Sequence, residues 1–125
     1  MDPSPEIIHP LPAGYEDSFR APKWVVSGGG GDPGLSQHGD LGRVFLAGDS
    51  AGGNIAHNVA MMAGRLEGAG EGEGSDVAAR IEGAALLHAA FGGREAVDGE
   101  TPEAVALSEK LWRAVCPEAA DGADD

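Results

Sequence analysis

One segment constrains the fold of this 125-residue chain more than any other. An apolar run over residues 43–47 ends at Gly48-Asp49-Ser50-Ala51-Gly52-Gly53, and helical periodicity follows over residues 54–66. A continuous apolar run suits a strand that is buried on both faces, as in a parallel sheet. The apolar residues that follow recur at helical spacing with alanines beside them, which is typical of a helix with a packing face of small residues. The segment therefore predicts a strand, a very tight turn and a helix.

The rest of the chain alternates in its periodicity. Residues 15–26 fit one helical face with acids in the first turn, and Pro22 inside them is expected to kink the helix or delay its start. Residues 81–87 form a second apolar run, interrupted by Glu82 and Gly83. Thr101-Pro102-Glu103 supplies the cap, the proline and the acid of a helix start. Helices that alternate with strands predict the α/β fold class with a parallel sheet.

Two glycine-rich stretches, residues 27–42 and 67–76, separate these segments and are predicted to be linkers. The second stretch is also acidic, so we expect it to be mobile and solvated. The whole chain, residues 1–125 with these linkers, has the size of one ordinary domain.

The charge and the cysteine usage exclude several classes of function. The formal net charge is −13, from 8 Lys+Arg against 21 Asp+Glu, so phosphate backbones and anionic membranes are expected to be repelled. No apolar run reaches 18 residues, and the N-terminus lacks a basic segment followed by an apolar stretch, so we expect a soluble, cytoplasmic protein. Cys116 is the single cysteine, so an internal disulfide is excluded. No His/Cys/Asp cluster has metal-ligand spacing, so no metal is expected, and no other cofactor is predicted. The sequence does not indicate an oligomeric state.

The predicted turn carries the main chemical signal, the pattern G-x-S-x-G. A tight turn would lift Ser50 above the sheet edge, and glycine at Gly48 and Gly52 would remove side chains that collide across it, while Gly53 adds room. The start of the helix supplies free amides, so the Ala51 N–H is expected to donate to an oxyanion. Ser50 is therefore the candidate nucleophile.

Simpler interpretations of the same residues stay open. An ordinary glycine-rich turn with an incidental serine would give the same five letters, although the flanking strand and helix favour the catalytic interpretation. Asp49 either hydrogen-bonds to hold the turn or is a solvated loop carboxylate.

A serine hydroxyl needs a base, and none of the four histidines fits that role. His57 lies along the same helix as Ser50, about 10 Å of rise away. His9 and His38 precede the serine, whereas the usual order is serine, acid, histidine. His88 follows the second strand and is a candidate pocket residue, for which a structural role is favoured over catalysis.

Residues 44–60, which include the turn, resemble the nucleophile strand, elbow and helix of plant carboxylesterases almost residue for residue. These enzymes belong to the hormone-sensitive-lipase-like group of the α/β-hydrolase fold. Residues 9–18 and 23–25 are similar to the stretch before the elbow. The resemblance continues in the next strand and loop, at Gly83 and over residues 86–88 and 91–93. It also includes a later cap-side helix, over residues 110–113 and 115–117. It therefore touches most of the chain outside the glycine-rich stretches.

This resemblance implies hydrolysis of a small-molecule carboxylic ester through an acyl-enzyme on Ser50, with the Ala51 amide as one oxyanion donor. The family's His-Gly-Gly motif would lie before residue 1, and its catalytic Asp and His after residue 125. The chain would then be a single incomplete α/β-hydrolase domain, a parallel sheet fragment flanked by helices, that is inactive by itself. The sequence departs from the family in two places. Pro22 lies inside the early helix, and Ala89-Ala90 replace the bulkier residues that are usual after the histidine.

Two alternatives remain. Plant gibberellin receptors share the fold and a similar elbow but bind a small acidic ligand without turnover. The residue at the catalytic His position would separate a receptor from an esterase. The other alternative is a truncated product that does not fold stably, because a sheet of two or three strands exposes apolar faces and edges.

Overall fold

The computed structural model describes residues 11–68, 72–92 and 96–117. The chain divides into two compact units, one formed by residues 1–14 with 91–125 and the other by residues 15–90. The unit of residues 15–90 contains the sheet and Ser50.

The sheet consists of two parallel strands, β1 (Val44–Asp49) and β2 (Ile81–Leu87). The register runs from Val44 opposite Ile81 to Asp49 opposite Leu87, with one irregularity after Val44. The helices α3 (Ala51–Gly68) and α4 (Gly72–Arg80) lie between the two strands in the sequence. The parallel sheet and the α/β class agree with the prediction, and the range of the second strand matches it residue for residue.

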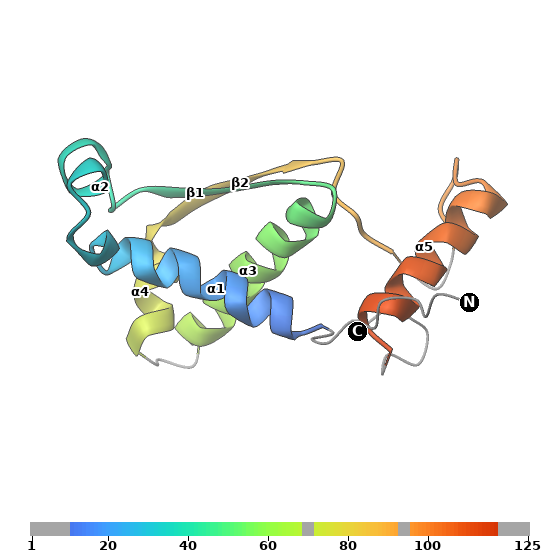
Figure 1. The fold of residues 1–125 in the computed structure, drawn as a ribbon, viewed down its shortest axis with the longest axis horizontal. Helices are drawn as coiled ribbons and strands as arrows, with labels where there is room; N and C mark the ends of the chain where they lie inside the picture. The colour runs from blue at the N-terminus through green and yellow to red at the C-terminus, as the bar shows by residue number, and fades with distance from the viewer. Residues whose placement is uncertain (1–10, 69–71, 93–95, 118–125) are drawn as a thin grey trace, which may run out of the picture. The chain divides into compact units, whose positions relative to one another are not determined.

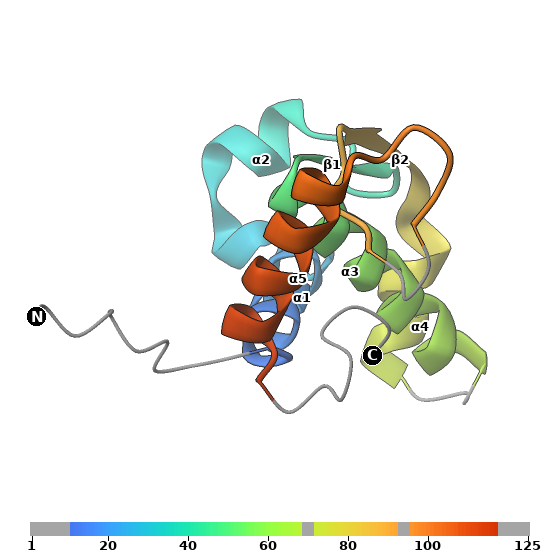
Figure 2. The ribbon, with the colours of Figure 1, turned by 90° about the vertical axis from the view of Figure 1, so that its right-hand side faces the viewer.

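Three helices cover one face of the sheet. Figures 1 and 2 show α1 (Ala13–Val26), α3 and α4 on the same side of the two strands. Their shared core consists of buried apolar side chains from all three helices, against which Leu46 of β1 and Ile81 of β2 pack. The buried members are Phe19, Val59, Ala63 and Val77.

The other face of the sheet is exposed in the described structure. Phe45 has 65% of its surface exposed and Leu87 has 53%. Residues of β1 alternate between partly buried and exposed, so the prediction of a strand buried on both faces is wrong for the described chain. The physical reason is that successive side chains point to opposite faces, and the described helices of this unit cover only one of them.

The glycine-rich stretch of residues 27–42 is not an unstructured linker. It contains a 3₁₀ turn, η1 (Gly29–Gly31), and a short helix, α2 (Pro33–His38). The Asp32 carboxylate accepts a hydrogen bond from the Leu35 amide at 3.0 Å, and Pro33 occupies the first turn. A capping acid followed by proline is a helix start signal, which the surrounding glycines obscured.

The second glycine-rich stretch, residues 67–76, is also partly helical. The helix α3 ends at Gly68, and α4 begins at Gly72. The sequence did not predict α4, although its residue Val77 is fully buried in the core. Burial of such apolar side chains against other elements stabilises a helix whose own propensity is low.

The helix α1 continues through Pro22 to Val26, so the proline does not delay its start. Pro22 removes one backbone donor, but its ring is buried. Tertiary packing therefore outweighs the local preference at this position.

The other unit contains α5 (Pro102–Val115), close to the predicted range. The Thr101 hydroxyl accepts a hydrogen bond from the Ala104 amide at 3.2 Å, so the predicted helix cap is confirmed. Within this unit the Leu11 amide donates to the Val115 carbonyl at 2.7 Å. The apolar face of α5 is largely exposed, with Leu107 at 59% and Leu111 at 58%.

Candidate active site

Ser50 is the single residue between β1, which ends at Asp49, and α3, which begins at Ala51. Its φ is 53°, in the left-handed region that non-glycine residues rarely adopt. Holding such a residue there costs about 1–3 kcal/mol, which the surrounding structure must supply. The backbone therefore makes a sharp and strained bend at this serine.

Backbone hydrogen bonds on both sides hold Ser50 in this conformation. Its amide donates to the Leu87 carbonyl at the end of β2, at 2.9 Å, and its carbonyl accepts from the Ala90 amide at 3.0 Å. The same carbonyl accepts from Gly53 at 3.1 Å and from Asn54 at 3.3 Å, in the first turn of α3. The serine is thus fixed to the neighbouring strand and to the helix at once.

Two of the three glycines in this turn are sterically required. A Cβ on Gly48 would lie 2.0 Å from the Gly52 carbonyl oxygen and 2.6 Å from the Gly53 nitrogen. A Cβ on Gly53 would lie 2.7 Å from the Ala89 Cβ. A Cβ on Gly52 would meet nothing within 4 Å, so the predicted steric role of that glycine is wrong. The crowding arises because the backbone of Gly52 lies against Gly48, whereas a side chain on Gly52 would point into open space.

The residues at the centre of this turn are open to solvent. Asp49, Ser50 and Ala51 are all exposed. As the first residue of α3, Ala51 has an N–H without an acceptor inside the helix, at the end where the helix dipole is positive. The turn therefore combines an exposed serine with an amide that can stabilise negative charge.

His88 lies beside this turn. It follows the last residue of β2, and because Leu87 pairs with Asp49, His88 and Ser50 leave adjacent strands at corresponding positions. His88 is exposed and has a φ of 45°, so it is a second non-glycine residue in the left-handed region. The carboxyl ends of neighbouring parallel strands meet at one sheet edge, which is where α/β folds build their sites.

The sequence analysis missed a buried polar group next to Ser50. Asn54 is 8% exposed, and its side-chain oxygen accepts a hydrogen bond from the Tyr15 hydroxyl at 2.6 Å. The Asn58 side-chain amide donates to the Asn54 carbonyl at 3.0 Å and to its side-chain oxygen at 3.3 Å. An asparagine among the small residues of a helix start was the available signal, but only the fold shows that Tyr15 reaches it.

The other predicted or excluded groups lie elsewhere. His57 is exposed on α3, His38 ends α2, and His9 lies outside the described residues. Within the described residues, no group of three or more His, Cys, Asp or Glu side chains could hold a metal ion. None of the helices in that part of the chain is both long enough and apolar enough to cross a membrane.

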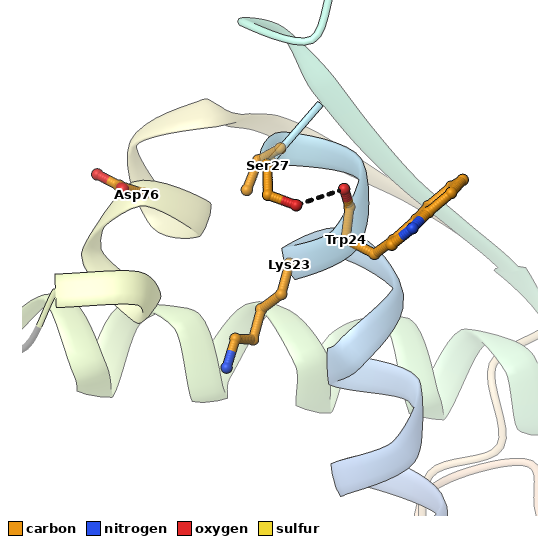
Figure 3. Close-up of a pocket in the computed structure, with 5 residues that line it drawn as sticks. Lys23, Trp24, Ser27 and Asp76 are labelled. Carbon is orange, nitrogen blue, oxygen red and sulfur yellow. Dashed lines mark hydrogen bonds between the residues drawn. The ribbon is translucent and has the colours of Figure 1, made fainter. Parts of the chain in front are cut away.

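A small cavity lies away from Ser50, at the carboxyl end of α1. Its volume is about 260 Å³, and Figure 3 shows Lys23, Trp24, Ser27 and Asp76 around it. The Ser27 hydroxyl donates to the Trp24 carbonyl at 2.9 Å. The Arg80 side chain donates hydrogen bonds to the carbonyls of Val26 and Leu41. Because β2 begins at the next residue, Ile81, this end of α1 lies where the strands begin. Ser50 follows the end of β1, so the cavity is separate from the candidate site.

Comparisons with known proteins agree with the α/β fold. A family model described as an alpha/beta hydrolase fold matches residues 4–124. Tuliposide A-converting enzyme 2, chloroplastic, from Tulipa gesneriana is 41% identical over 122 residues, which are 94% of this chain and 28% of that protein. Probable carboxylesterase 13 from Arabidopsis thaliana is 37% identical over 123 residues, 94% of this chain and 36% of that protein. Probable carboxylesterase 4, mitochondrial, from the same plant is also 37% identical, over 93% of this chain and 30% of that protein.

These relatives correct the predicted location, and the chain matches only part of their length. Two of them are named chloroplastic and mitochondrial, so the predicted cytoplasmic location is wrong. That prediction rested on the lack of a secretory signal and of a long apolar run, whereas chloroplast and mitochondrial addresses are read from amphipathic segments rich in Arg and Ser. The chain spans only 28% to 36% of the length of these relatives.

Proposed function

Because this chain belongs to the α/β-hydrolase family, we propose that it carries the nucleophilic serine, Ser50, of a carboxylic ester hydrolase. The observation that carries the proposal is the exposed Ser50 at φ 53°, alone between a parallel strand and the start of a helix. That geometry is what the G-x-S-x-G turn of this fold requires of a nucleophile. Two of the similar proteins are named probable carboxylesterases, which supports an ester as the substrate class.

The proposed chemistry proceeds in two balanced steps. The Ser50 oxygen attacks the ester carbonyl carbon while its proton passes to a base, and the alcohol leaves with a proton to give an acyl-serine. Water then attacks the acyl carbon, releasing the carboxylic acid and restoring the hydroxyl. In each tetrahedral intermediate the Ala51 N–H donates to the oxyanion, and loss of one such donor costs about 10²–10³ in rate in serine proteases.

The base is assigned to no residue of this chain. The fold's order is serine, acid, histidine, and only His88 follows the serine outside its helix. His88 borders the turn, so we assign it to the wall of the site, where it would contact the bound ester. Without a base, residues 1–125 are expected to turn over esters very slowly.

The test places this chain within a longer relative. Residues 1–125 replace the matching segment of Arabidopsis thaliana probable carboxylesterase 13, and the chimera is compared with residues 1–125 alone. A fluorophosphonate probe is expected to label Ser50 of the chimera, with hydrolysis of p-nitrophenyl acetate, and Ser50→Ala is expected to abolish both. A folded chimera that hydrolyses the ester equally well with Ser50→Ala would refute the assignment of the nucleophile.

Residues 1–125 alone provide the second comparison. Slow or absent turnover is expected, because we assign no residue of this chain as the base that takes the proton of Ser50. Rapid turnover that depends on Ser50 would contradict the proposed inactivity of this chain by itself and would make His88 the first candidate base.

A further inference from the structure

We propose that the Tyr15–Asn54 pair is the positioning device that fixes Ser50 and the Ala51 amide relative to each other. Neither side chain is assigned a contact with the substrate. The inference rests on the proposed role of Ser50, but the contacts that carry it are independent of that role.

The first observation is where the buried amide lies. Asn54 is in the first turn of α3, and its backbone N–H donates to the carbonyl of Ser50 at 3.3 Å. It is 8% exposed, the one buried polar residue among those described. Polar groups are rarely buried unless a hydrogen bond compensates for the lost water, so its side-chain contacts are strongly constrained.

The second observation is what those contacts join. The Tyr15 hydroxyl, on α1, donates to the Asn54 side-chain oxygen at 2.6 Å across a separation of 39 residues. Asn58, one turn further along α3, donates to the same oxygen at 3.3 Å. Asn54 is thereby tied to a second helix and to its own helix, and its backbone is tied to the serine.

The third observation is that Ser50 is strained. A residue at φ 53° relaxes unless its neighbours hold it, and its amide and carbonyl are held by Leu87 and Ala90 on the β2 side and by Gly53 and Asn54 on the helix side. On the helix side, the anchor through Tyr15 prevents the start of α3 from shifting away from the strand. A shift there would move the Ala51 N–H relative to the serine oxygen, and small misplacements of this kind lower rates sharply.

Hydrogen exchange of the 125-residue chain tests this anchor without requiring activity. Tyr15→Phe removes only the hydroxyl, and Asn54→Ala removes the acceptor. Each is expected to accelerate exchange of the Ser50 and Ala90 amides about tenfold, the usual effect of one net hydrogen bond. Because both variants break the same bond, the double variant is expected to exchange no faster than Asn54→Ala alone.

Val77→Ala is the matched control, because it weakens the core of the same unit through α4. It is expected to leave the ratio of Ser50 exchange to Ala63 exchange unchanged, whereas Tyr15→Phe raises that ratio. An equal ratio in Tyr15→Phe and Val77→Ala, or additive effects in the double variant, would overturn the proposal.

Labelling of Ser50 by the fluorophosphonate in the chimera gives the functional readout. Tyr15→Phe is expected to lower the maximal labelling rate about tenfold while the half-saturating probe concentration stays the same. Faster exchange with an unchanged labelling rate would also overturn the proposal, because the pair would then be only structural. Loss of labelling in the unsubstituted chimera refutes the role of Ser50 instead, and the exchange ratio still decides whether the anchor exists.

Discussion

The substitution Gly48→Ala tests most directly why this chain can place a serine between a strand and a helix. The new Cβ would lie 2.0 Å from the Gly52 oxygen, 2.2 Å from the Gly52 carbonyl carbon and 2.6 Å from the Gly53 nitrogen. Non-bonded atoms normally stay about 3.5–4.0 Å apart, so the backbone would have to open by roughly 1.5 Å. All three contacts are with backbone atoms at the start of α3, which cannot rotate away as a side chain could.

The expected magnitude follows from those contacts. Overpacking a well-packed site costs typically about 1–3 kcal/mol, and the rigid neighbours place Gly48→Ala at about 3 kcal/mol or above. A domain has only about 5–15 kcal/mol of stability in total, so this variant is expected to lose a large part of it. Because the opening displaces Gly52 and Gly53, fluorophosphonate labelling of Ser50 in the chimera is expected to be lost as well.

Gly52→Ala is the matched control, four residues along the chain. An added Cβ there meets nothing within 4 Å, and alanine is the better helix former by about 0.5–1 kcal/mol. Urea unfolding followed by circular dichroism measures both free energies of unfolding. If Gly48→Ala unfolds within about 0.5 kcal/mol of the parent chain, the tight approach of Gly48 to Gly52 does not exist and the steric argument fails.

Two further substitutions test other parts of the structure. Thr101→Ala removes the hydroxyl that accepts a hydrogen bond from the Ala104 amide, so α5 is expected to lose about 1 kcal/mol of stability. The measurement is hydrogen exchange of the Ala104 amide, which is expected to become faster. Unchanged exchange would contradict the cap. Phe45 is 65% exposed, so Phe45→Thr is expected to change the free energy of unfolding by no more than about 0.5 kcal/mol. The same substitution is expected to reduce binding of an apolar dye. A loss of stability above about 2 kcal/mol would mean that this sheet face is covered.

The sequence by itself determined the elements whose signals are local. The apolar run before Gly48 and the small-residue helix after it predicted β1, the turn and α3, since side-chain spacing reports secondary structure directly. Thr101 followed by Pro102 predicted the start of α5, because a cap acts within one helical turn. The motif also identified Ser50 as the candidate nucleophile, a role that stays a prediction.

Other features depend on contacts between residues far apart in the chain, and only the tertiary structure decided them. The burial of Val77 lets α4 form in a stretch whose composition indicated a linker, and buried packing lets α1 continue through Pro22. The contact between Tyr15 and Asn54 spans 39 positions, which no periodicity records. Which glycine of the turn is indispensable also depends on the path of the backbone: Gly48 lies against Gly52, whereas Gly52 faces open space. Local chemistry sets what each segment can form, but distances between segments are set only when the chain packs.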